Sequence, residues 1–198
     1  MSYGLRVYLV DAAEIRQFPG KRNKTLLKDI LRERSDELAD LNENFADVIE
    51  DYCPEFSFEQ ALKEIFTGKF SQTEATFIYG WAFDLLCSFI GQWVHRECDR
   101  WSTEWLQTLD KTLASGNVDL QFYGSLVDDC PVKLPENPDG IPAIGHWTHE
   151  SMMKAITPLD VLGPQVEDKE LAHSLAEIRV WLEDASKKPD VILVGVYG

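Results

Sequence analysis

The side chains best suited to acid–base or metal chemistry lie in one short segment, which reads GHWTHE. Its two imidazoles, His146 and His149, and the carboxylate of Glu150 form an H-x-x-H-E pattern, which is neither the H-E-x-x-H zinc motif nor its inverse. Thr148 has the character of a helix N-cap, so His146 should precede the first turn and the two imidazoles need not share a face. A zinc site would have to recruit nearby aspartates or a distant cysteine. We therefore expect capping or surface histidines here, and no metal site.

A second candidate is Asp84, which lies within the apolar run Thr76–Val94. A buried carboxylate needs a hydrogen-bonding partner or a raised pKa, so Asp84 could act as an acid in a pocket lined by aromatic side chains such as Tyr79. The alternative is an ordinary polar stripe on a mostly buried helix, because Asp84, Ser88 and Gln92 follow one another at four-residue intervals. The regular spacing favours the stripe.

Other catalytic signatures are missing from the sequence. It contains no Gly-rich phosphate loop, no dinucleotide-binding fingerprint and no pattern typical of a serine or cysteine triad. We therefore expect no cofactor, and we favour a non-catalytic role over an enzyme of unknown class.

The strongest electrostatic feature is an acidic segment in a chain whose formal net charge is −15. Between Arg34 and Lys63 there are nine acids and no basic residue. Apolar residues recur through the same segment at helical spacing, which predicts an amphipathic helix with a negative outer face. These apolar residues are Leu38, Leu41, Phe45, Val48, Ile49 and Tyr52. Nucleic acid is a poor partner for this face, because phosphate binding needs lysine and arginine.

A basic protein partner suits the acidic segment, because opposite charges speed and orient association. The carboxylates that we expect to contact this partner are Asp40, Glu43, Asp47, Glu50 and Asp51. The plain alternative is a solvated face that only keeps the protein in solution.

The apolar run 76–94 has about the length of a membrane span. It nevertheless contains Asp84 and other polar side chains, and its flanks lack the excess of lysine and arginine that orients such helices. The first residues show no charged leader followed by an apolar stretch and a cleavage site, so we expect no signal peptide. The four cysteines form no C-x-x-C pair, which indicates free thiols. These patterns predict a cytoplasmic protein that does not enter the membrane.

The remaining sequence predicts the elements that carry these residues. Residues 5–10 and 191–197 read as strands, and we expect them in the same sheet because each is too apolar to stand alone. Residues 118–123 alternate like a further strand. The helices between the strands begin at capping residues, which include Ser57, Ser71, Ser102 and Thr148.

The apolar run predicts the central helix of the fold. It should begin after Ser71 and continue past Val94, and the side chains expected in the core are Phe83, Leu86, Cys87 and Ile90. A length of 198 residues suits one domain. The prediction is therefore a single, mostly helical α+β domain over residues 1–198, with a small sheet that includes the N-terminal and C-terminal strands.

A proline-rich loop is expected at about 124–147. Long loops without regular structure are uncommon in compact domains and are often functional. If the chain binds a small molecule, this loop could form the mouth of the pocket. The pocket candidates are Tyr79, Asp84, His146 and Trp147.

Several short motifs carry a family resemblance. They read, in order, MSYGLRVYLVD, ALKEIFTG, YGWAFDLLCSFIG, GHWTHE and EIRVWLEDASKKPDVILVGVYG. Together they resemble a group of uncharacterised bacterial proteins and, more distantly, the YfbM-like family of small α+β proteins. In that family the GHWTHE position is a turn followed by Leu-Thr-Pro-Glu, and His149 replaces the proline. The resemblance implies an α+β fold and a helix cap at Thr148, and it implies no reaction.

The sequence thus favours a non-catalytic cytoplasmic interaction protein whose acidic face binds a basic protein, for example as an antitoxin or immunity protein. One alternative is a small-molecule-binding domain or an enzyme of unknown class, with a pocket near the 124–147 loop. A purely structural accessory domain is a third.

Overall fold

The structure is a computed structural model that describes residues 4–95, 101–137 and 140–198. The chain divides into two compact units, which are described here one at a time. The first unit comprises segments 1–12, 91–131 and 143–198, and the second comprises segments 13–90 and 132–142.

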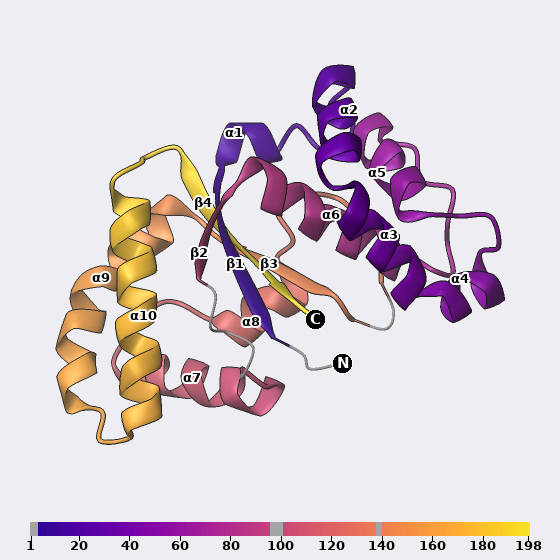
Figure 1. The fold of residues 1–198 in the computed structure, drawn as a ribbon. Helices are drawn as coiled ribbons and strands as arrows, with labels where there is room; N and C mark the ends of the chain where they lie inside the picture. The colour runs from indigo at the N-terminus through magenta and orange to yellow at the C-terminus, as the bar shows by residue number, and fades with distance from the viewer. Residues whose placement is uncertain (1–3, 96–100, 138–139) are drawn as a thin grey trace. The chain divides into compact units, whose positions relative to one another are not determined.

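The described part of the first unit contains a four-stranded antiparallel sheet in the order β2–β1–β4–β3 (Figure 1). The strands are β1 (Leu5–Asp11), β2 (Gln92–His95), β3 (Ala143–Trp147) and β4 (Val191–Tyr197). The central pair, β1 and β4, runs in unbroken register from Leu5 opposite Tyr197 to Asp11 opposite Val191. Both strands are rich in apolar residues on both faces, which suits central strands of a sheet. The α+β assignment and the prediction of one shared sheet are confirmed.

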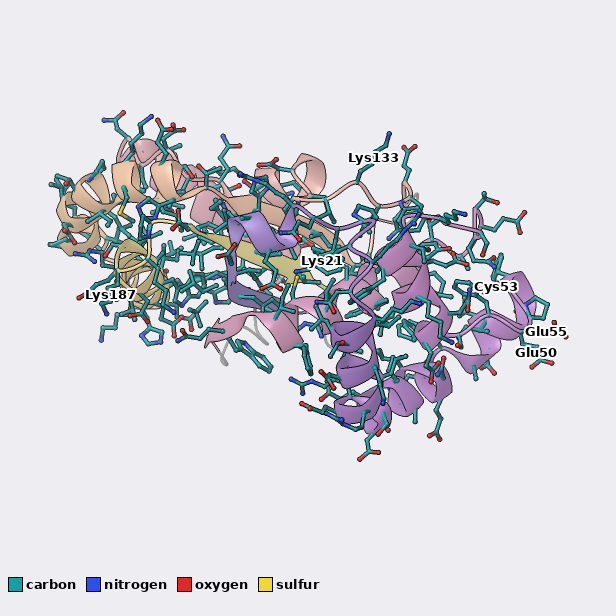
Figure 2. The ribbon with its side chains drawn as sticks, turned by 90° about the horizontal axis from the view of Figure 1, so that it is seen from above. Lys21, Glu50, Cys53, Glu55, Lys133 and Lys187 are labelled. Carbon is teal, nitrogen blue, oxygen red and sulfur yellow. The ribbon has the colours of Figure 1, made fainter. Side chains whose placement is uncertain are left out.

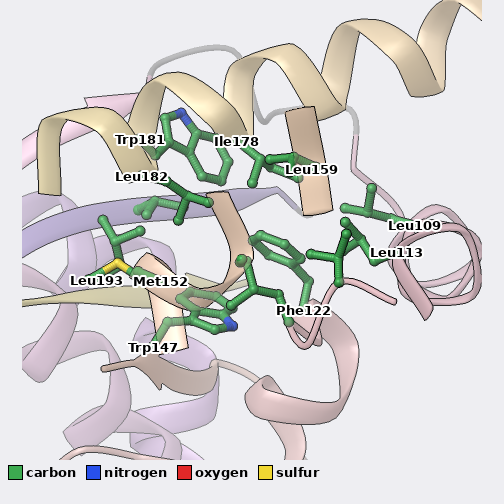
Figure 3. Packing of buried hydrophobic residues seen from close by; sticks show 14 of the residues in the cluster. Leu109, Leu113, Phe122, Trp147, Met152, Leu159, Ile178, Trp181, Leu182 and Leu193 are labelled. Carbon is green, nitrogen blue, oxygen red and sulfur yellow. The ribbon is translucent and has the colours of Figure 1, made fainter. Parts of the chain in front are cut away.

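Helices of the first unit form a hydrophobic core with one face of this sheet. They are α7 (Thr103–Ser115), α8 (Phe122–Asp128), α9 (His149–Leu162) and α10 (Lys169–Ser186). Figure 3 shows Trp181 of α10, Phe122 of α8 and Trp147 of β3 among the packed side chains. The ring centroids of Phe122 and Trp147 lie 4.8 Å apart, and those of Trp101 and Trp181 lie 5.6 Å apart. Aromatic pairs at these distances add to the stabilisation that burial provides.

The second unit is built from helices in its described residues. They are α1 (Ala12–Ile15, whose first residue falls in the first unit), α2 (Lys24–Glu33), α3 (Ser35–Asn44), α4 (Ala46–Tyr52), α5 (Phe58–Thr67) and α6 (Phe77–Ile90). Helix α6 carries the apolar run and packs against α5. Phe83, Leu86 and Cys87 are fully buried as predicted, whereas Ile90 is only half-buried.

The central helix is shorter than predicted at both ends. It begins at Phe77, because Ser71 is not its N-cap but donates hydrogen bonds to Glu64. It ends at Ile90, and the chain continues as the edge strand β2, which pairs with β1. A short apolar run does not distinguish helix from strand by its pattern, and Trp93 and Val94 are good strand formers.

The strand predicted over residues 118–123 does not form. Residues 118–121 lack regular structure, and Phe122 begins helix α8. The reason is a cap from another helix, because the carboxylate of Asp110 on α7 accepts hydrogen bonds from the backbone N–H groups of Phe122 and Gly124. Local alternation cannot reveal a cap that comes from elsewhere in the chain.

The proline-rich loop is shorter than the predicted segment 124–147. Helix α8 includes residues up to Asp128, and β3 begins at Ala143, which leaves residues between 129 and 142 without helix or strand where they are described. Gly145 lies within β3 rather than in a loop. A Cβ added at Gly145 would approach the backbone oxygen of Ser125 to 2.5 Å, so glycine is what allows α8 to pack this closely on β3.

The predicted N-caps fall into two groups. Ser102 and Thr148 each accept a hydrogen bond from the backbone N–H three residues later, as expected. Ser57 does the same with Gln60, but the Gln60 side chain donates to Glu64 instead of reaching back to Ser57. Only half of that capping box is therefore present.

Candidate functional site

The acidic segment forms an exposed surface on α3 and α4. We use the name acidic surface for its five exposed carboxylates: Asp40, Glu43, Asp47, Glu50 and Asp51. None of the five forms an ion pair with any residue that the structure describes. Arg34, the last basic residue before the segment, pairs with Glu37 instead. The acidic surface therefore carries negative charge without local compensation.

The predicted amphipathic helix is two helices that meet at Phe45. The ring of Phe45 lies 5.3 Å from that of Phe77 and 5.7 Å from that of Phe58, measured between centroids. Asn42 adds a polar tie, since its Oδ1 accepts from the backbone N–H of Phe58 and its Nδ2 donates to Glu59, both at 3.1 Å. Aromatic packing and this amide hold the acidic surface on the unit in spite of the repulsion among its carboxylates.

Helix α4 is unusual because none of its residues is buried. A surface helix normally buries one apolar stripe, and a helix of seven residues has little stability of its own. Two apolar side chains of α4 nevertheless lie open to solvent, Val48 at 38% and Tyr52 at 58% exposure. Helix α4 thus exposes both apolar side chains and carboxylates to solvent.

A shallow groove of about 350 Å³ lies beside α4. Its apolar lining comes from two residues of α4 and from the turn that leads into α5. The lining residues are Asn42, Ala46, Ile49, Glu50, Pro54, Glu55, Phe56 and Ser57. Figure 2 shows Glu50 and Glu55 near each other at this end of the unit, with their side chains directed away from the ribbon. The groove therefore combines an apolar lining with two carboxylates.

The turn beside the groove has an uncommon backbone geometry. Glu55 adopts a φ of 75°, in the left-handed region that favours glycine. Such a conformation costs about 1–2 kcal/mol for a residue with a Cβ. The turn is held nonetheless by a hydrogen bond from the N–H of Phe56 to the carbonyl of Cys53, at 3.0 Å.

Tyr79, one of the predicted pocket residues, belongs to a buried hydrogen-bond network centred on Glu64. The Glu64 carboxylate is 7% exposed and accepts from the Tyr79 hydroxyl, from the Ser71 N–H and hydroxyl at 2.8 and 2.7 Å, and from the Gln60 amide at 3.1 Å. The Tyr79 oxygen also accepts from the N–H of Gln72 at 3.0 Å. The network connects α5, the segment before α6, and α6 itself, so its evident role is structural.

The pKa values of the two central groups follow from this network. Burial raises the pKa of Tyr79, and the hydrogen bond that it donates to Glu64 raises it further, to about 12. Burial alone would raise the pKa of Glu64, but the hydrogen bonds donated by Tyr79 and Ser71 outweigh it and leave that pKa below its ordinary value. Glu64 is therefore ionised near neutral pH, and uncharged groups donate the hydrogen bonds that its buried carboxylate needs.

Sequence reasoning did not single out Glu64. Its position was visible as the acidic residue of ALKEIF, between the buried Leu62 and Ile65 on α5. An acid at an inward helical position needs several donors, and that need is the signal that could have identified it.

Asp84 does not lie on a solvated stripe. It is 7% exposed in the middle of α6, Ser88 donates from its hydroxyl to the carbonyl of Leu85, and Gln92 belongs to β2. The expected polar stripe is therefore absent, because the helix ends before its third member. Tyr79 and Asp84 share α6, whereas His146 and Trp147 lie in β3 of the other unit.

His146 and Trp147 both take part in packing within the first unit. The indole N–H of Trp147 donates to the carbonyl of Gln121 at 2.9 Å, and the side chain is 4% exposed. His146 Nδ1 lies 2.7 Å from the carbonyl oxygen of Asp129. His149 is the first residue of α9, and Thr148 caps that helix, as predicted. His146 and Trp147, which are neighbours in the sequence, thus form hydrogen bonds that fix α8 beside β3.

Across ranges 4–95, 101–137 and 140–198, no three side chains of the metal-binding types are placed to share an ion. Over the same ranges, no helix is both long enough and apolar enough to cross a bilayer. Cys53 and Cys87 are buried, Cys130 is exposed, and none of the three forms a disulfide with a described residue, while Cys98 lies outside the described residues.

The family model described as a domain of unknown function (DUF7691) matches residues 1–198. No curated protein and no solved structure matches the chain.

Proposed function

The chain belongs to this family of unknown function, and we propose that it is a non-catalytic interaction protein whose acidic surface binds a basic protein. The proposal rests on the exposure of helix α4. It buries none of its residues and exposes Val48 and Tyr52 between the carboxylates of Asp47, Glu50 and Asp51. A protein interface needs both features, since apolar side chains supply affinity at its centre and charges supply steering around it.

The lack of compensating charge also supports the proposal. Five exposed carboxylates without a paired lysine or arginine among the described residues repel one another, which costs stability in the isolated protein. A surface that served only solubility would do as well with charges of both signs. A basic partner would relieve this repulsion on binding.

An antitoxin or immunity protein is one kind of interaction protein that fits this proposal. One that neutralises a basic toxin would use such a surface, because electrostatic steering lets it capture its target quickly. A cytoplasmic location, a bacterial origin and a distant relation to the YfbM-like family complete the proposal, and the last two are supported by the short sequence motifs alone.

The test is an association-rate measurement on a partner isolated by affinity capture from cells that produce the protein. The variant replaces Asp40, Glu43, Asp47 and Glu50 by Asn or Gln together. With the purified partner at low salt, we expect the variant to associate about 10- to 100-fold more slowly than the wild type. The difference should shrink toward 0.15 M salt and above, because charges separated by more than a Debye length of about 8 Å are then screened.

A matched control separates position from net charge. It neutralises the same number of charges at Asp119, Glu167, Glu170 and Asp190, exposed carboxylates of the first unit that form no ion pair with a described residue. We expect this control to associate at close to the wild-type rate. Equal rates for the wild type and the acidic-surface variant at low salt would refute the proposal.

A further inference from the structure

We infer that the groove beside α4 holds one apolar side chain of the basic partner, and that Glu50 and Glu55 pair with lysine or arginine residues next to that anchor in the partner sequence. This inference rests on the proposed function, because it specifies how the basic partner is held. It adds a recognition element, a basic segment with a single apolar anchor.

The lining of the groove fits an apolar side chain. Ala46, Ile49, Pro54 and Phe56 contribute the apolar lining of a volume of about 350 Å³. This volume is at the lower end of the range for ligand pockets, about 300–1,000 Å³, and the groove is shallow rather than enclosed. An anchor side chain that enters from a partner surface needs no enclosing walls, since the partner itself covers the opening.

Two residues of the groove lining are fixed in advance. The ring of Phe56 packs edge-on against Tyr79 with centroids 5.9 Å apart, and Tyr79 is tied into the Glu64 network. Asn42 accepts a hydrogen bond from the backbone N–H of Phe58. Side chains that are already ordered lose little conformational entropy when an anchor enters, which favours affinity.

The charges around the groove favour a basic polypeptide over a small cation. Glu50 and Glu55 are both exposed at its lining, and neither pairs with a described residue. The acidic surface continues from there to Asp47 and Asp51 of α4 and to Asp40 and Glu43 of α3. A polypeptide with several basic side chains and one apolar side chain can meet the groove and these carboxylates together, whereas a small cation offers no apolar group.

The two parts of the surface should then control different rates. Carboxylates along α3 and α4 act before contact and set the association rate, whereas an apolar anchor acts after contact and sets the dissociation rate. Loss of the anchor should therefore speed dissociation at every salt concentration.

The experiment is selection of a randomised dodecapeptide display library on the whole 198-residue chain. The probe is the wild type, and the test variant is Ala46→Trp, in which the new ring fills the groove from an exposed position on α4. The matched control is Ala114→Trp, which adds the same ring at an exposed position on α7 in the first unit. Circular dichroism and thermal unfolding check that both variants fold.

We expect the wild type and Ala114→Trp to select peptides with one aliphatic or aromatic position flanked by lysine or arginine, and Ala46→Trp to lose them. For a synthetic peptide of the selected sequence, labelled and measured by fluorescence anisotropy, replacement of the anchor by serine should raise Kd about tenfold or more. The same rise is expected for the unaltered peptide with Ala46→Trp.

The outcomes separate the inference from the proposed function. Basic peptides that lack a common apolar position and bind Ala46→Trp as well as the wild type would overturn the groove inference alone. Selected peptides without an excess of lysine and arginine would overturn the proposed function as well.

Discussion

The buried network of Glu64 and Tyr79 supplies the sharpest prediction about stability, through the substitution Tyr79→Phe. This change removes one hydroxyl and leaves the ring in place, against Phe56 and Phe70 at centroid distances of 5.9 and 4.9 Å. It therefore tests the hydrogen bonds of the network without creating a cavity.

The magnitude follows from the bonds that the hydroxyl makes. A hydrogen bond to a charged group such as the Glu64 carboxylate contributes about 1.5–3 kcal/mol. The N–H of Gln72 also loses its acceptor, whereas the N–H of Ser71 keeps Glu64 at 2.8 Å. An unsatisfied donor costs about 1–3 kcal/mol when buried, and less here because Gln72 is only half-buried. Tyr79→Phe should therefore lower the free energy of unfolding by about 2–4 kcal/mol.

Urea unfolding of the full chain, followed by far-ultraviolet circular dichroism, measures this loss. The control is Tyr52→Phe, because Tyr52 is 58% exposed on α4, and a change there should stay within about 0.5 kcal/mol. A loss below about 1 kcal/mol for Tyr79→Phe would show that water or rearrangement replaces the hydroxyl, and the network argument would be wrong.

Three other predictions concern the fold. Leu86→Ala should cost about 2–5 kcal/mol, because Leu86 is fully buried in α6, and urea unfolding would contradict this with a loss under about 1 kcal/mol. Because the pKa of Glu64 is lowered in the fold, its contribution to stability should be full above about pH 4.5, the region of the unfolded pKa, and be lost as the pH falls through the folded value. Glu64→Gln should therefore flatten the acid limb of stability plotted against pH, and an unchanged limb would oppose the assignment. Gly145→Ala should destabilise strongly, since the new Cβ would meet the Ser125 backbone, whereas Gly163→Ala, with open space around the Cβ, should be neutral or slightly stabilising in thermal unfolding. Equal effects of the two substitutions would contradict the close packing of α8 on β3.

The strands at the two ends of the sequence could be predicted because their patterns are local and strong. Residues 5–10 and 191–197 are rich in β-branched and apolar side chains, and such segments need neighbouring strands to satisfy their backbones. Capping at Ser102 and Thr148 was predictable for the same reason, since each bond joins residues three apart. These predictions depend on no distant part of the chain.

The predictions that were wrong depended on contacts with residues outside the segment whose structure was predicted. Asp110, on the preceding helix, caps α8 and removes the strand expected at 118–123, and Glu64, on α5, takes Ser71 away from its expected role as an N-cap. The end of α6 at Ile90 depends on the pairing of β2 with β1, near the start of the sequence. The apolar periodicity within a segment encodes none of these contacts.

The acidic surface was identified from charge alone, but the structural features on which the proposed docking role rests were not predicted. Sequence periodicity placed Val48, Ile49 and Tyr52 on the inner face of one amphipathic helix. The break at Phe45 turns α4 so that Val48 and Tyr52 are exposed and Ile49 lines the groove. A break between two helices changes which side chains of the second helix are buried. The helical spacing of apolar residues continues through this break, so the sequence pattern does not reveal it.

The most direct test of the acidic surface is carboxylate footprinting by carbodiimide coupling to glycine ethyl ester, with and without the captured partner, read by mass spectrometry. We predict that the partner protects Asp40, Glu43, Asp47, Glu50 and Asp51 from modification and leaves Asp119, Glu167 and Asp190 as reactive as in the free protein. Unchanged modification of the acidic surface in the complex, with protection elsewhere, would contradict the account.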